Sequence, residues 1–182
     1  HIDRCFHHIK NRKHTAIDIG GHCGFWSFYL GGNFKKVYAF EPVEIFRECF
    51  KKNIPHGNVE LLPVALGNEN GFVSMNAELE NTGATHVSSN TNDLNKVELK
   101  KLDDYELTDV DFIKIDVEGY EPSVLKGAAE VINSSLPLIF FECNQEHVAD
   151  YFNSEMSLNY DFFEINDKLG TIKKISKLTS SK

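Results

Sequence analysis

Apolar positions along the chain fall into two kinds of block that follow one another in turn. Short apolar runs have the length of buried strands, and the stretches between them repeat apolar residues at helical spacing. This alternation is typical of repeated β-α-β units, which build a mostly parallel sheet. The strands predicted for that sheet are Thr15–Ile19, Val37–Phe40, Val59–Val64, Asp111–Val117 and Pro137–Glu142.

The predicted helices lie between these strands, at Gly24–Leu30, from Pro42 onward, at Pro122–Ile132 and at Gln145–Phe152. Two shorter strands, 71–75 and 97–99, flank a polar segment, 78–95, that we expect to be a long loop. Near the end, Tyr160–Ile165 and Thr171–Ile175 are strand-like and enclose turn residues, which predicts a hairpin. We therefore predict an α/β fold: a Rossmann-like, doubly wound, mostly parallel seven-stranded sheet with an antiparallel C-terminal hairpin.

Composition and charge narrow the class of protein. A chain of 182 residues with 41% hydrophobic residues can form one packed core, so we expect a single domain over residues 1–182, with a core at about 14–176. The formal charge of −8 offers no broad positive field to a phosphate backbone, which argues against a nucleic-acid partner. No apolar run approaches the ~20 residues of a membrane span, and four scattered cysteines suit a reducing compartment. We expect a cytoplasmic protein, and its oligomeric state is open.

The turn after the first predicted strand holds three glycines, Gly20, Gly21 and Gly24. In open α/β sheets, ligands bind at the carboxyl ends of the strands, and the first strand-to-helix turn is where the backbone must approach them closely. Glycine allows that approach and would bring the N–H groups of the turn up to a ligand. A tight turn without any ligand would use the same residues, so the glycines alone predict no particular cofactor.

Two acidic residues near this turn favour a ligand. Glu41 ends the second strand about 20 residues after the glycines, where an acid can accept the hydroxyl hydrogens of a ribose. At the start of a helix, Glu41 would also be stable as a plain N-terminal charge. Asp18 ends a buried strand, and a buried carboxylate needs a partner. We expect that partner to be the amides of the glycine turn or the ammonium of a bound amino-acid group.

The spacing of these residues distinguishes between cofactors. The dinucleotide pattern G-x-G-x-x-G fits no frame of the turn, because it requires glycine at Ile19 in one frame and at His22 in the other. Asp18, Gly20 and Gly24 instead match acid-x-Gly-x-x-x-Gly, which suits a cofactor without a pyrophosphate but with an amino-acid end. S-adenosylmethionine is such a cofactor. A nicotinamide-dependent Rossmann oxidoreductase and a non-catalytic module that binds S-adenosylmethionine are the alternatives.

Five blocks of sequence together resemble the FkbM-type methyltransferases, which are class I enzymes that depend on S-adenosylmethionine. The blocks are Asp18–Gly24, Ala39–Pro42, Val64–Gly67, Leu102–Asp104 and Ile113–Glu121. The resemblance as a whole spans about residues 15–142, because Val124–Gly127 and Pro137–Glu142 follow the last block. The last block is the most specific. His22 departs from the family pattern, in which asparagine is usual at this position.

The resemblance implies roles for residues of the cofactor site. Asp18, Gly20 and Gly24 would shape the methionine end of that site. Glu41 would hold the ribose, and Ala65 would lie near the adenine. Further cofactor contacts are predicted for Gly21, His22, Phe25, Pro42 and Asp116. The resemblance also implies O-methylation of a hydroxyl on a sugar, glycan or other small-molecule acceptor.

A hydroxyl acceptor must lose a proton, which requires a general base or a metal that lowers the hydroxyl pKa. Asp116 and Glu118 follow the central strand and Glu142 ends the next one, so these carboxylates should meet beside the cofactor. We expect Asp116 to be the base, with Glu118 and His86 of the polar loop as further catalytic candidates. Asp116 and Glu142 are candidate ligands for Mg²⁺, although a base without a metal is favoured. Alternatively, Glu118 would stabilise a helix start and Glu142 would pair with Lys114.

Overall fold

A five-stranded parallel sheet forms the centre of the computed structural model, which describes residues 6, 9, 13–76, 86–88, 96–143, 145–156, 159–166 and 170–180. At residues 76 and 86–88 only the backbone is described. The order of the strands is β3-β2-β1-β8-β9, and every neighbouring pair is parallel. The strands are β1 (Thr15–Ile19), β2 (Lys36–Phe40), β3 (Val59–Leu62), β8 (Val110–Ile115) and β9 (Leu138–Phe141). All five strands predicted for this sheet are confirmed.

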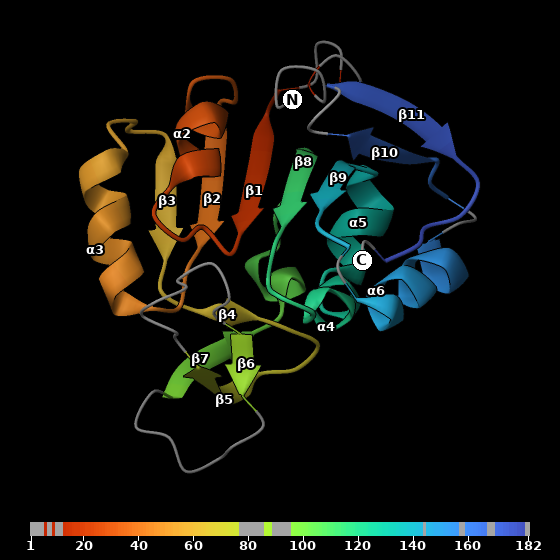
Figure 1. Ribbon diagram of the computed structural model, residues 1–182. Coiled ribbons are helices and arrows are strands. Elements are labelled where there is room, and N and C mark those ends of the chain that lie inside the picture. Colours follow the sequence, from red (N-terminus) through yellow and green to blue (C-terminus); the bar gives the residue numbers. More distant parts are fainter. Residues whose placement is uncertain are drawn as a thin grey trace.

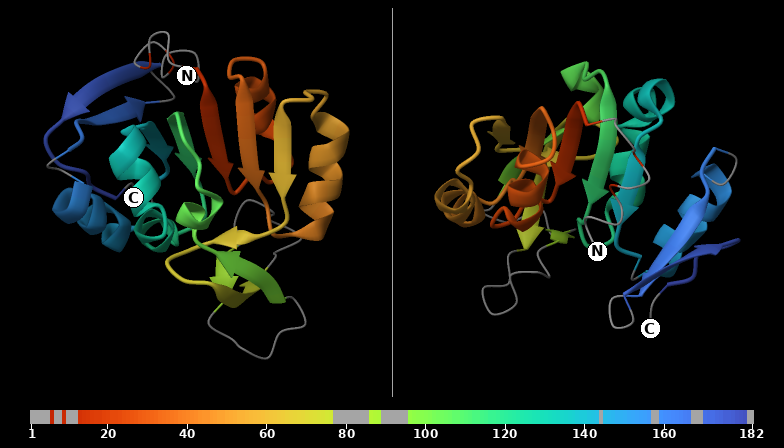
Figure 2. Two further views of the ribbon diagram at one scale, coloured as in Figure 1. Left: turned by 180° about the vertical axis from the view of Figure 1, so that it is seen from behind. Right: turned by 90° about the horizontal axis from the view of Figure 1, so that it is seen from above.

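Helices cover both faces of the sheet, as a doubly wound fold requires: α2 lies on one face and α5 on the other (Figures 1 and 2). The helices are α2 (Phe25–Gly31), α3 (Glu44–Asn53), α4 (Glu121–Lys126), α5 (Ala129–Ser135) and α6 (Glu146–Tyr151), which a π-helical turn (Phe152–Met156) extends. A 3₁₀ helix (Leu102–Tyr105) precedes β8. None of the helices in the described ranges is long and apolar enough to span a membrane.

The helix predicted over 122–132 is two helices, α4 and α5. Gly127 lies at the break, where a Cβ would be 1.8 Å from the carbonyl oxygen of Gly67. This close approach of two backbone segments leaves no room for a side chain. The break therefore depends on a contact between distant parts of the chain, which helical spacing does not register.

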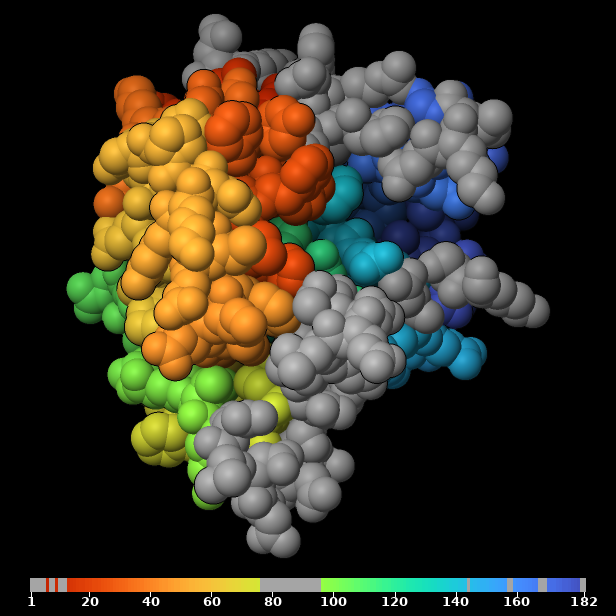
Figure 3. All heavy atoms as spheres, turned by 60° about the vertical axis from the view of Figure 1, so that its left-hand side comes forward, coloured from red at the N-terminus to blue at the C-terminus, as the bar shows by residue number. Residues whose placement is uncertain are grey.

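A second, four-stranded sheet is inserted between β3 and β8 and lies beyond the carboxyl ends of the parallel strands (Figure 1). Its order is β4-β7-β5-β6, formed by β4 (Ala65–Leu66), β5 (Gly71–Asn76), β6 (His86–Ser88) and β7 (Lys96–Lys100). In the space-filling view its yellow and green surface adjoins the orange surface around α3 (Figure 3). The short strands predicted at 71–75 and 97–99 are confirmed. The predicted loop at 78–95 contains β6, which pairs with β5, and its remaining residues lie outside the described ranges.

The predicted C-terminal hairpin is confirmed as β10 (Phe162–Asn166) paired antiparallel with β11 (Thr171–Ile175). Its relation to the main sheet differs from the prediction of seven strands in one sheet. In the described residues, the backbone pairing divides these strands into five and two. The hairpin contacts the rest of the protein through side chains such as Phe162, which is buried in the main core.

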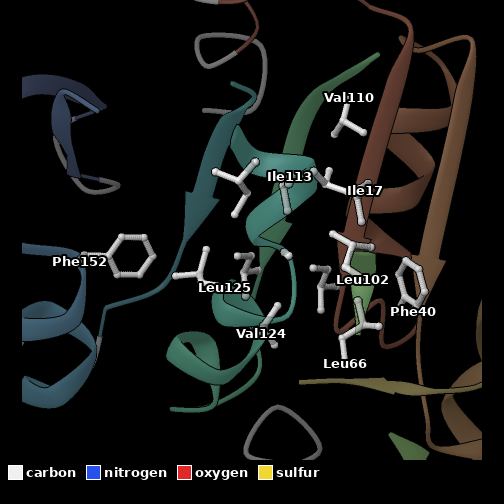
Figure 4. Close-up of a cluster of buried hydrophobic side chains, with 14 of the residues drawn as sticks. Ile17, Phe40, Leu66, Leu102, Val110, Ile113, Val124, Leu125 and Phe152 are labelled. Carbon is white, nitrogen blue, oxygen red and sulfur yellow. The ribbon is translucent and has the colours of Figure 1, made fainter. Parts of the chain in front are cut away.

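The core has two parts, one on each face of the sheet. Ile17 and Ile113 point into the larger part, where they pack with residues of α4 and α5 (Figure 4). Phe112, the neighbour of Ile113, points to the opposite face and belongs to the smaller part. Strands buried on both faces are expected to be almost continuously apolar. Asp18 and Lys114 are charged exceptions, and they are direct neighbours in the register of β1 and β8.

Candidate functional site

A cavity of about 320 Å³ opens where β1, β2 and β8 end. The strand order reverses at β1, because β2 pairs on one side of it and β8 on the other. Ligands of open α/β sheets bind at such a switch point. Residues predicted for the site that line the cavity are Gly20, Gly21, His22, Phe25, Glu41, Pro42, Ala65, Asp116 and Glu118.

Four residues predicted for the site are not among those lining this cavity. Asp18 is buried at the end of β1, Gly24 is the last glycine of the turn, and Glu142 lines a separate, small cavity together with Glu118. His86 begins β6 opposite Asn76, and its side chain lies outside the described residues. Its predicted role as a base therefore stays a prediction.

The glycine turn is shaped by close contacts with neighbouring segments. Gly20 has a φ of +76°, and a Cβ there would lie 2.1 Å from the Asp116 carbonyl oxygen. Gly24 has a φ of +93°, and its Cβ would lie 2.9 Å from the side chain of Ile54. Both positions combine a left-handed backbone with a lack of space, so both require glycine.

The backbone amides of the turn are used within the protein. The amides of Gly20 and Gly21 each donate a 3.0 Å hydrogen bond to the carbonyl oxygen of Phe40. The amide of His22 donates a 2.8 Å bond to Glu41 Oε2. The turn thus curls over the end of β2, contrary to the prediction that its N–H groups face a ligand.

Asp18 is fully buried, and its partners also come from the protein. Ser27 Oγ donates a 2.6 Å hydrogen bond to Asp18 Oδ2, and Lys114 Nζ lies 3.3 Å from Asp18 Oδ1. The same ammonium donates to the carbonyl oxygens of Ile19 at 3.2 Å and Gly20 at 2.7 Å. The described partners of Asp18 are therefore Ser27 and Lys114, and not the turn amides that were predicted, because cross-strand register brings Lys114 beside it. The predicted pairing with a ligand ammonium stays a prediction. The signal for Lys114 in the sequence was a basic residue between the apolar residues Ile113 and Ile115 of a buried strand.

Glu41 is 4% exposed and is held by two backbone amides. Its Oε1 accepts a 2.8 Å bond from the Val43 amide at the start of α3, and its Oε2 accepts the bond from His22. Burial raises the pKa of Glu41, while these two hydrogen bonds and the charge of Lys114 oppose the rise. Glu41 thus occupies both places considered for it, the wall of the cavity and the start of a helix.

His22 adopts a left-handed backbone with a φ of +45°. Asparagine is among the residues that tolerate this region best, which explains why asparagine suits the position in the family pattern. The His22 ring lies 4.3 Å from the Phe46 ring, and its buried Nε2 has no hydrogen-bond partner in the described structure. Burial, and then the charge of Lys114, lowers the pKa of His22, so the ring is neutral at neutral pH.

The turn after β8 carries the acidic residues of the site. Asp116 has a side chain that is 42% exposed, and its Oδ2 lies 3.6 Å from Lys114 Nζ. Glu118 and Gly119 have left-handed backbones, with φ values of +51° and +93°. Glu121 is buried, accepts a 3.2 Å bond from the Val117 amide, and has a pKa raised by burial. Glu121 therefore stabilises the turn and the start of α4.

The carboxylates of Asp116, Glu118 and Glu142 converge, as predicted from the ends of β8 and β9. Each offers an oxygen within 4.8 Å of the others, and this cluster is referred to as the acidic triad. Such oxygen ligands suit a hard cation, and the exposed Asp116 carboxylate also suits a general base. Among the described ion pairs, Lys114 joins Asp18 and Asp116; the alternative pair with Glu142 is not present.

Comparison with known proteins places the chain in a family. The profile of the methyltransferase FkbM domain matches residues 18–173. The fold is similar to a crystal structure of methyltransferase FkbM from Methylobacillus flagellatus KT, with a TM-score of 0.54 and 19% identity over 72% of this chain. The match covers 33% of that protein, so this chain spans about a third of its length.

A weaker similarity links the chain to the DhpI–SAH complex, with a TM-score of 0.40 and 10% identity over 99% of this chain and 68% of that one. No curated protein matches the sequence. The FkbM profile nevertheless covers most of the chain. The chain therefore belongs to the FkbM methyltransferase family.

Proposed function

We propose that this chain binds S-adenosylmethionine in the cavity at the ends of β1, β2 and β8 and transfers its methyl group to a hydroxyl of a sugar, glycan or other small molecule. The observation that carries the proposal is the charge of the cavity wall. Its acidic lining residues are Glu41, Asp116 and Glu118, against one lysine, Lys114. An excess of negative charge suits a sulfonium cation.

The same wall argues against a nicotinamide dinucleotide. A pyrophosphate is bound by free backbone amides at the first strand-to-helix turn. In this chain the amides of Gly20, Gly21 and His22 are already bonded to Phe40 and Glu41. A pyrophosphate would therefore meet acidic side chains without the donors it needs.

Size and shape agree with a nucleoside-containing ligand. A cavity of about 320 Å³ is within the range of small-molecule sites. Glu41 retains acceptor capacity toward the cavity, since a carboxylate has about four acceptor positions and the amides of Val43 and His22 occupy two. We assign to Glu41 the two hydroxyls of the ribose, and to Ala65 the neighbourhood of the adenine.

Catalysis then depends on holding the acceptor in line and removing its proton. S-adenosylmethionine supplies an electrophilic methyl group on a sulfonium. Asp116 lines the cavity and is accessible. It would accept the proton of the acceptor hydroxyl while the hydroxyl oxygen forms a bond to the methyl carbon. The bond between that carbon and the cofactor sulfur would break, and its electron pair would stay on sulfur. Glu118 would keep the acceptor oriented at the rim.

Calorimetric titration tests the cofactor. We expect S-adenosylmethionine and S-adenosylhomocysteine to bind and NAD not to bind. Binding of NAD with no binding of either sulfur compound would contradict the proposal and favour an oxidoreductase. Methyl transfer from labelled cofactor to a panel of saccharides and other hydroxyl acceptors then separates an enzyme from a non-catalytic binding module.

Magnesium dependence is measured in the same transfer assay. The acidic triad is the position we assign to Mg²⁺ if the reaction needs it. Loss of activity in EDTA and its recovery with Mg²⁺ would support the ion at the triad. Activity that persists in EDTA would leave Asp116 as a base without a metal.

A further inference from the structure

Lys114 is the buried basic residue of the cavity wall, and it lies where the glycine turn after β1 meets the turn after β8. Its side chain is 3% exposed. Its ammonium lies 3.3 Å from Asp18 Oδ1 and 3.6 Å from Asp116 Oδ2. It also donates hydrogen bonds to the carbonyl oxygens of Ile19 and Gly20. One group thus contacts the glycine turn after β1 and the carboxylate after β8.

Stability alone is a poor reason for this arrangement. Removing two opposite charges from water costs free energy that their attraction often fails to recover, and an apolar replacement of the pair is commonly as stable. The direct neighbours of Lys114 in β8, Ile113 and Ile115, are apolar and buried, so an apolar residue at position 114 would suit this part of the strand. The ion pair is instead placed at the one end of the strand that borders the cavity.

The contacts of Lys114 complement those at the other side of the glycine turn. At the end of β2, a carbonyl oxygen accepts hydrogen bonds from the amides of Gly20 and Gly21. On the other side, the Lys114 ammonium donates hydrogen bonds to the carbonyl oxygens of Ile19 and Gly20. Hydrogen bonds therefore hold the glycine turn on both sides, through its backbone amides on one side and its carbonyl oxygens on the other. Only the Lys114 side also reaches the predicted base, Asp116.

We propose that Lys114 is a positioning residue for the bound cofactor and for the base: its ammonium joins the glycine turn to the Asp116 carboxylate and holds the two halves of the site in register. The inference rests on the proposed function and deepens it. Lys114 acts through these neighbours, and its removal loosens the turn and frees the Asp116 side chain at the same time.

A second consequence is electrostatic. After burial, the charge of Lys114 is the largest factor that lowers the pKa of His22, and it also opposes the rise in the pKa of Glu41. Other groups that act on Glu41 are the amides of Val43 and His22, which lower its pKa, and Asp18, which raises it. Asp116 raises the pKa of His22. Arg47 of α3 donates a 3.2 Å bond to the carbonyl oxygen of Glu41. Loss of the Lys114 charge should therefore raise the pKa of both Glu41 and His22.

The test compares Lys114→Met and Lys114→Arg with the control Lys36→Met, which removes an exposed lysine paired with Glu60 on the surface of β2. Folding is checked by circular dichroism and thermal denaturation. Binding of S-adenosylhomocysteine is measured by calorimetry across a pH series. The titration of His22 is followed by NMR without any ligand.

We expect Lys114→Met to weaken S-adenosylhomocysteine binding about tenfold or more, because a charge-assisted contact to the turn is lost. The acid midpoint of binding and the titration midpoint of His22 should both move to higher pH. Lys114→Arg should keep both midpoints, since the charge remains, and should restore affinity only in part, because a guanidinium has another shape. Lys36→Met should match the wild type in every measurement.

Several results would overturn the proposal. One is a folded Lys114→Met that binds within twofold of the wild type with unchanged midpoints. Failure of both variants to fold is another, since it would assign Lys114 to fold stability alone. If the wild type itself binds no S-adenosylhomocysteine, the proposed function fails. The ligand-free titration of His22 would then still decide the electrostatic part, and an unchanged midpoint in folded Lys114→Met would refute it.

Discussion

The turns after β1 and β8 occupy equivalent places, yet they are built differently. Each leads from a central strand into a helix at the carboxyl edge of the sheet, and each uses left-handed backbone positions. In the first turn, Gly20 and Gly21 are bonded to the end of β2, and the nearby Asp18 and Glu41 are buried. In the second, the carboxylates of Asp116 and Glu118 converge near the surface with that of Glu142, which follows β9.

From this difference we expect the first turn to hold the cofactor and the second turn to take part in the reaction. A turn whose amides are hydrogen-bonded within the protein presents a fixed surface, which is what a cofactor needs for binding in one orientation. An exposed carboxylate can exchange a proton with acceptor and solvent, which a buried and bonded carboxylate cannot do easily. Besides Lys114, the backbone joins the two turns: the Asp116 amide donates a 3.2 Å hydrogen bond to the carbonyl oxygen of Ile19, and a Cβ on Gly20 would lie 2.1 Å from the Asp116 carbonyl oxygen.

The largest effect is expected where both turns are disturbed together. Gly20→Ala would place a Cβ against the Asp116 carbonyl and would force alanine into a left-handed backbone. We expect a loss of about 3 kcal/mol in the free energy of unfolding, together with loss of S-adenosylhomocysteine binding. Chemical denaturation and calorimetry measure the two effects. Gly57→Ala is the control, because a Cβ there meets nothing within 4 Å; equal effects at both positions would contradict the contact.

The Asp116→Asn variant tests whether the turn after β8 serves the reaction and the glycine turn serves cofactor binding. The amide is close in shape but cannot accept the proton, so the methyl-transfer rate should fall by about 10²–10⁴-fold. Affinity for S-adenosylhomocysteine should change only slightly, because the glycine turn is intact. Single-turnover assays with labelled cofactor and calorimetry test the pair of expectations, with the exposed Asp150→Asn as control. Full activity in Asp116→Asn would remove this residue as the base.

Glu41→Gln should show the opposite behaviour, with weakened binding. Loss of a charged hydrogen-bond acceptor for the ribose should reduce affinity by about 10–100-fold. Burial raises the pKa of Glu41, and the ionised form is the one that accepts both hydroxyls. Wild-type affinity should therefore fall as the pH is lowered through a midpoint above the usual carboxyl range. The affinity of Glu41→Gln should not depend on pH in this range. If the same pH dependence persists in the variant, another group is responsible for the titration.

The smallest effect is expected at His22. Asparagine tolerates the left-handed backbone and, like the neutral imidazole, carries no charge, so His22→Asn should change affinity by less than about threefold. His22→Val should destabilise the protein by about 1–2 kcal/mol, because a β-branched residue is strained at this φ. Thermal denaturation of the two variants checks the difference. A larger loss in the asparagine variant would show that the ring itself contacts the cofactor.

Parts of this site were predictable from short stretches of sequence. The strand β1 and the turn at Gly20 follow from an apolar run that ends in glycine, and Glu41 follows from its place after β2. Helical spacing at 122–132 was misleading, because the break at Gly127 is caused by the backbone of Gly67. The triad was predictable since parallel strands end at the same edge of a sheet.

By itself, the sequence determined the parallel α/β architecture, the place of the glycine turn and the family, because periodicity and motif spacing are properties of neighbouring residues. Only the tertiary structure decided what each buried charge pairs with. Asp18 and Lys114 meet through the register of β1 and β8, and Gly20 and Gly21 bond to the end of β2. These contacts depend on strand pairing between distant segments, and a local pattern carries no information about that pairing.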